Sequence, residues 1–68
     1  MFWLQLFGPK ADGGVGVENI KFSFTTIESA ISEARALAVI ETFEWGKATG
    51  YKIFDEAKRV VTEGKFET

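Results

Sequence analysis

The chain alternates apolar and polar positions near both ends and changes to a helical spacing in the middle. Residues 2–7 alternate with a period of two, which is typical of a pleated strand. The alternation returns over residues 17–25, where Ile20, Phe22 and Phe24 lie on one side and polar residues on the other. Both segments therefore predict strands with one buried face.

A turn-rich segment separates these two strands. Residues 8–16 contain four of the seven glycines, the only proline and the pair Asp12-Gly13, which is a strong hairpin signal. The segment therefore predicts a hairpin connection.

Residues 25–44 have the periodicity of an amphipathic helix. Thr25 with Glu28 three positions later is a capping box, and Thr26 is the rival N-cap. One stripe of the helical wheel collects small and branched apolar residues: Ile27, Ala30, Ile31, Ala34, Leu37 and Ala38. The alanines predict a helix that approaches a sheet closely.

The last turns of this segment depart from the pattern, because Glu41 projects onto the apolar stripe. Other apolar residues lie on the opposite side: Ala36, Val39, Ile40 and Phe43. Either the helix ends early or its far end is covered on two sides. Gly46 and Gly50 then end the helix and lead to the next strand.

Residues 51–54 and 59–63 predict two more strands, joined by a turn at residues 55–58. The expected fold is α+β, a two-layer ββαββ sandwich with one helix packed on a four-stranded, mostly antiparallel sheet. Residues 1–68 form one small domain. We expect the two hairpins to lie side by side, although the pairing order stays open at this point.

Composition narrows the functional classes. The 68 residues carry 8 basic and 10 acidic side chains, for a net charge of -2, which disfavours a protein that depends mainly on phosphate contacts. Cysteine and histidine are both absent, so disulfides and the usual zinc ligands cannot stabilise so small a domain. Oligomerisation is the remaining way to enlarge the buried surface.

The apolar start of the chain does not have the pattern of a targeting segment. Residues 1–7 lack a basic region and a small-residue cleavage site, and Gly8-Pro9 interrupts them. The sequence predicts neither a signal peptide nor a membrane span, and we expect a cytoplasmic location.

A resemblance to small bacterial domain families of unknown function extends over about half of the chain. Their signature is a capped helix with regularly spaced alanines followed by a short hairpin. The chain is similar at Thr26, Ala30, Ile31, Ala34, Arg35, Ala38, Tyr51, Ile53, Asp55, Arg59 and Val60. The resemblance implies the fold and carries over no functional residues.

One position departs from that signature. The families look like Asp-x-x-Gly-Arg at the second hairpin, whereas Lys58 stands where the glycine would be. Because an ordinary residue pays about 1–2 kcal/mol for a left-handed backbone, we expect this turn to be longer or differently shaped.

Candidate chemistry is sparse. The glycine-rich residues 13–16 lead into a strand and not into a helix N-terminus, which favours a hairpin connector over a phosphate loop. The carboxylate pairs Glu41 with Glu44 and Asp55 with Glu56 have no third ligand or nucleophile nearby in the sequence. The sequence therefore predicts no enzyme, no cofactor and no metal site.

The candidate functional residues lie on the outer face of the predicted sheet. If Leu4, Leu6, Phe22, Phe24, Ile53 and Val60 face the helix, the opposite side displays Trp3, Phe7, Phe54 and Val61 with Gln5, Lys21, Ser23, Lys52 and Arg59. Such an aromatic patch favours association, because apolar surface gains by leaving water.

We consider three alternative hypotheses for what binds this face. The favoured hypothesis is a homodimer, in which Ile40, Phe43 and Trp45 at the helix end join the contact. The second is single-stranded nucleic acid, with bases stacked on Trp3, Phe7 and Phe54 and phosphates bound by Lys21, Lys52 and Arg59; the acidic net charge weighs against it. The third is a protein partner that adds a strand to the sheet edge.

Overall fold

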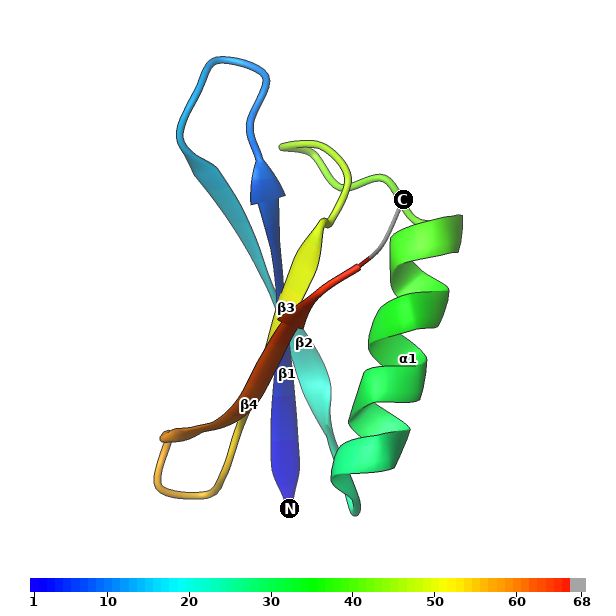
Figure 1. The fold of residues 1–68 in the computed structure, drawn as a ribbon, viewed down its shortest axis with the longest axis vertical. Helices are drawn as coiled ribbons and strands as arrows, with labels where there is room; N and C mark the ends of the chain where they lie inside the picture. Colours follow the sequence, from blue (N-terminus) through cyan, green and yellow to red (C-terminus); the bar gives the residue numbers. More distant parts are fainter. Residues whose placement is uncertain (67–68) are drawn as a thin grey trace.

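The structure of the chain, a computed structural model, describes residues 1–66 and has the element order β-β-α-β-β (Figure 1). Its elements are β1 (Phe2–Pro9), β2 (Val15–Phe24), α1 (Ile27–Ile40), β3 (Gly50–Phe54) and β4 (Val60–Lys65). The predicted α+β fold, one helix with a four-stranded antiparallel sheet, is confirmed.

The sheet has the order β2-β1-β3-β4, and every neighbouring pair of strands is antiparallel. Each hairpin stays together and the two hairpins lie side by side, as the sequence predicted. The pairing order that the sequence left open is settled by β1, which pairs with β3. The first strand of the chain is therefore a central strand, and β2 and β4 form the two edges.

Helix α1 covers one face of this sheet (Figure 1). It contacts β1, β2 and β3. Ala30 and Ala34 are fully buried against Leu4, Leu6 and Ile53, which are the largest fully buried side chains. The predicted alanine stripe is confirmed, because these small side chains let the helix lie close to the leucines of β1.

The helix is shorter at both ends than residues 25–44. Thr26 is the N-cap, and its hydroxyl oxygen accepts a hydrogen bond from the Ser29 N–H at 3.0 Å, so the predicted capping role of Thr25 is wrong. At the other end Glu41 is extended, with its N–H donating to the Leu37 carbonyl at 2.9 Å. By ending there, the helix keeps the Glu41 carboxylate exposed instead of aimed at the core.

The segment after the helix folds back onto the sheet. Phe43 and Gly46 exchange backbone hydrogen bonds of 2.9 and 3.0 Å, and this tight turn stacks the Phe43 and Trp45 rings at 5.3 Å. Trp45 lies on the backbone of the first hairpin, where a Cβ atom at position 16 would overlap its indole. The sequence predicted no surface within the chain that would cover Phe43 and Trp45. In the structure both are packed against the core.

The second hairpin has a short loop of Glu56, Ala57 and Lys58. Asp55 closes it, because its Oδ1 accepts from the N–H groups of Ala57 at 2.9 Å and Arg59 at 3.0 Å. The backbone hydrogen bond from Arg59 is the main cause that lowers the Asp55 pKa below its ordinary value. Lys58 itself adopts the left-handed backbone, with φ of 63°, so a lysine here has the conformation that glycine favours.

Replacing Lys58 with glycine is expected to stabilise the protein by about 1 kcal/mol, because glycine adopts this backbone without the Cβ clash. The measurement is the free energy of unfolding in denaturant at fixed protein concentration. Lys58→Ala is the control, since alanine removes the charge and keeps the clash. Equal stability of the glycine and alanine variants would contradict the prediction.

Candidate interaction surface

The face of the sheet opposite α1 displays three aromatic side chains on the two central strands. Trp3 of β1 and Phe54 of β3 are direct cross-strand partners. Phe7 of β1 pairs with Gly50, and its ring lies across that glycine, because a Cβ at position 50 would overlap the ring. We call the surface formed by Trp3, Phe7, Phe54, Val17 and Val60 the outer face. The sequence predicted that Trp3, Phe7 and Phe54 lie on this face, and the strand pairing confirms it.

Strand β2 completes the outer face on one side. Val17 pairs with Phe7, and Asn19 pairs with Gln5. The Gln5 Nε2 donates to the Asn19 Oδ1 at 2.8 Å, so the two side-chain amides lie together. The pairing then shifts between Trp3 and Gln5, which leaves Lys21 exposed within the irregular stretch of β2.

Strand β4 has a different register from the one that was predicted. Val60 pairs with Phe54 and is 46% exposed on the outer face, so its predicted place against the helix is wrong. Val61 is exposed at the register shift that follows. Arg59 precedes the strand, and its Nε donates to the Asp55 Oδ2 at 3.2 Å within the turn instead of lying on the outer face. The loop geometry sets this register.

Basic side chains accompany the aromatic rings. The Lys52 Nζ lies 6.0 Å from the centre of the Phe7 ring, within reach of a cation–π contact. On β4, Glu63 pairs with Lys52 and Lys65 pairs with Gly50, so both project on the same side as Phe7. Two lysines and one glutamate therefore lie beside the aromatic rings, in a chain whose net charge is -2.

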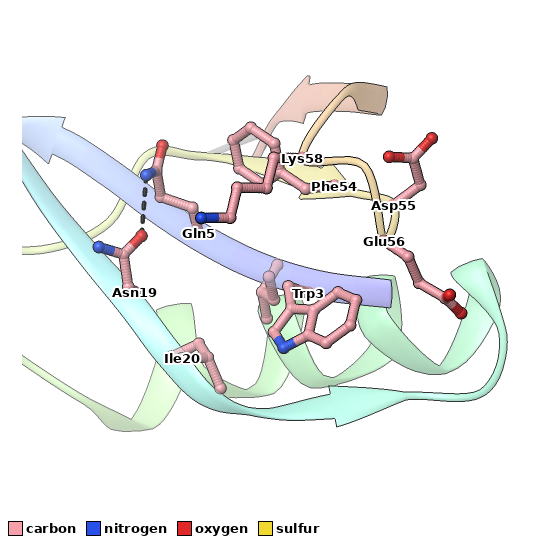
Figure 2. A pocket seen from close by; sticks show the side chains of 9 residues that line it. Trp3, Gln5, Asn19, Ile20, Phe54, Asp55, Glu56 and Lys58 are labelled. Atoms are coloured by element: carbon pink, nitrogen blue, oxygen red, sulfur yellow. Dashed lines mark hydrogen bonds between the residues drawn. The ribbon is translucent and has the colours of Figure 1, made fainter. Parts of the chain in front are cut away.

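A depression of about 450 Å³ lies beside Trp3, where the register of β1 and β2 shifts. Figure 2 shows Trp3 and the Gln5–Asn19 amide pair along it, with the Lys58 side chain extending over it from the second hairpin. The Glu56 carboxylate is directed away from it in the same view. The depression offers aromatic faces, amide groups and one ammonium group.

The helix-end residues do not join this surface. Phe43 and Trp45 are half-buried against the core, and Trp45 covers Gly16 on the helix side of the sheet. Ile40 is 71% exposed, but it belongs to the helix layer. The turn after Ile40 folds Phe43 and Trp45 inward, so these two rings do not lie on the face that carries Trp3, Phe7 and Phe54, and a role of the helix end in a contact between copies stays a prediction. Phe22, predicted to face the helix, is also exposed and contacts Phe24 at the edge.

Sequence reasoning missed Asn19, Val17, Val60 and Lys58 as parts of this surface. A signal existed for Val60, because a hairpin with a loop from Glu56 to Lys58 places Asp55 opposite Arg59 and so Val60 opposite Phe54. The irregular stretch of β2 has no comparable signal, since its alternation continues unbroken through Ile20, Phe22 and Phe24.

The remaining sequence candidates have structural roles. Gly13 and Gly14 lie in the loop of the first hairpin, where the Lys10 N–H donates to the Gly14 carbonyl at 3.2 Å, and residues 15 and 16 begin β2, so this glycine-rich segment leads into a strand as predicted. Within residues 1–66, no group of three or more acidic side chains is placed to hold a metal ion. None of the helices in the described part of the chain has the length and apolar character that a membrane crossing requires.

Neither the protein-family models, nor the curated proteins, nor the solved structures give a match to this chain.

Proposed function

We propose that the chain is a self-associating interaction module that buries its outer face against the same face of a second copy. The observation that carries the proposal is the cross-strand cluster of Trp3, Phe7 and Phe54 on the face opposite α1. Trp3 is 39% exposed in the single chain. Fully burying side chains of this size gains roughly 1.5–3 kcal/mol each, and a two-fold contact gains this from both copies.

The small core supports the same proposal. Within residues 1–66 only seven apolar residues are buried, and two of them are helix alanines. A domain of this size buries about 60% of the surface that its unfolded chain exposes. Packing two sheets face to face would supply a second apolar layer, in which the aromatic rings of both copies interdigitate.

The mass in solution tests this proposal. Sedimentation of the wild type at tens of micromolar is expected to give at least a dimer, and the double variant Trp3→Ser, Phe54→Ser is expected to be smaller. Val39→Ser is the matched control, because Val39 is 75% exposed in the helix layer; its mass should equal that of the wild type. A monomeric wild type, or equal masses for the wild type and a folded double variant, would refute the proposal.

A second candidate function is binding of single-stranded nucleic acid on the same face. Lys52 near Phe7 and Lys58 over the depression favour it, because stacked bases bring phosphates that lysines bind. The Trp45→Phe background leaves Trp3 as the only tryptophan, so its emission reports on the outer face directly. Binding should quench this emission at low salt and lose affinity at high salt. Unchanged emission at low salt would exclude this function.

A further inference from the structure

Strand β4 presents an open edge of the sheet. It is the last strand in the order β2-β1-β3-β4, and α1 contacts the other three strands within the described residues. The Phe66 N–H donates to the Thr49 carbonyl at 2.8 Å, and Gly64 pairs with Tyr51. Because backbone direction alternates along a strand, the N–H and C=O groups of Glu63 and Lys65 point away from β3.

The other edge is less suited to pairing. Strand β2 shifts its register beside Trp3, and such an irregularity interrupts an edge ladder. Helix α1 also contacts β2. Strand β4 has its register shift at the first residues, so the segment from Thr62 to Lys65 is regular.

We propose that β4 pairs antiparallel with β4 of a second copy, so that Glu63 lies opposite the partner's Lys65. This inference rests on the proposed self-association and adds a second contact to it. Both side chains project on the outer side of the sheet, since they pair with Lys52 and Gly50. A two-fold axis at Gly64 makes the ion pair twice, once in each direction.

Charge selects this register from the alternatives. Only residues whose backbone groups point outward can exchange hydrogen bonds across the new ladder. Moving the axis to Glu63 would place that side chain against the partner's Glu63, and moving it to Lys65 would oppose two lysines. Opposite charges directly across a ladder stabilise it, and like charges destabilise it. A lysine on an edge strand normally discourages pairing, but here the partner's Glu63 neutralises it.

The two proposed contacts have different geometries. The axis of the β4 contact is perpendicular to the sheet, so both helices lie on one side and the two outer faces become neighbours in one continuous sheet. The axis of the face-to-face contact runs parallel to the sheet, in the interface between the two copies. One contact therefore does not block the other, and both together give an assembly larger than a dimer.

Charge inversion tests the β4 contact. In the Trp3→Ser, Phe54→Ser background, which removes the face-to-face contact, the parent chain is expected to be a dimer at high concentration. Glu63→Lys alone and Lys65→Glu alone should each give monomers. In either variant, positions 63 and 65 carry the same charge, so each cross-strand pair places two like charges opposite each other. A mixture of these two variants should form a 1:1 heterodimer, since each lysine again meets a glutamate.

The outcomes separate this inference from the proposed function. A wild type that associates while the Trp3→Ser, Phe54→Ser chain is monomeric overturns the β4 contact and leaves the face-to-face contact standing. The β4 contact is also overturned if either single inversion variant still dimerises in this background, or if the mixture stays monomeric. A monomeric wild type overturns the proposed function and this inference with it.

Discussion

Leu6→Ala is expected to lose about 2–5 kcal/mol of folding free energy, the usual range for a fully buried leucine. Leu6 has no exposed surface and lies on β1, the strand that pairs with both β2 and β3. At roughly 0.05–0.15 kcal/mol per residue, a chain of 68 residues has only about 3–10 kcal/mol to lose. Much of the variant should therefore be unfolded at physiological temperature.

Denaturant unfolding followed by circular dichroism measures this loss, with all chains at one concentration because association adds to apparent stability. Val39→Ala removes apolar atoms from a side chain that is 75% exposed and should change the unfolding free energy by less than about 0.5 kcal/mol. A Leu6→Ala loss within that same range would show that β1 is not the centre of the core.

Gly16→Ala is expected to cost about 1–3 kcal/mol, the range for forcing atoms into a packed site. The new methyl group would overlap the indole of Trp45, which lies on the hairpin backbone. Trp45→Ala is the larger change, at about 3 kcal/mol, because it removes the ring that covers Gly16 and stacks on Phe43. Both costs would come from one contact.

A double-mutant cycle separates this explanation from a backbone effect of alanine at position 16. In the Trp45→Ala background the methyl group meets no ring, so the additional cost of Gly16→Ala should fall below about 0.5 kcal/mol. An undiminished cost in that background would place its origin in the strand itself. Trp45→Phe serves as the conservative control, since it keeps an aromatic ring and removes the buried Nε1, which has no hydrogen-bond acceptor within residues 1–66.

The sequence predicted the fold well because its periodicities are strong where the core is. The alanines of α1 and the leucines of β1 define their buried faces without ambiguity, and the two hairpins have distinct turn residues. The residue at which the helix ends was harder to predict. Apolar content over residues 39–45 extended the predicted helix, whereas the cost of burying Glu41 ended it at Ile40.

The surface was predicted only in part, because its central strands follow simple alternation and its edges do not. Trp3, Phe7 and Phe54 follow from the period of two. The place of Val60 follows from the short loop of the second hairpin, whereas the irregular stretch of β2 at residues 20–22 depends on a register shift against β1. Such long-range pairing leaves no local pattern in the residues themselves.

The central position of β1 also has a consequence for synthesis on the ribosome. Strand β1 is made first, but its second neighbour, β3, begins only at Gly50. At about 5–20 residues per second, several seconds separate the two strands. During that interval one side of the nascent β1 has no strand to pair with, so the sheet can close only after β3 has been made.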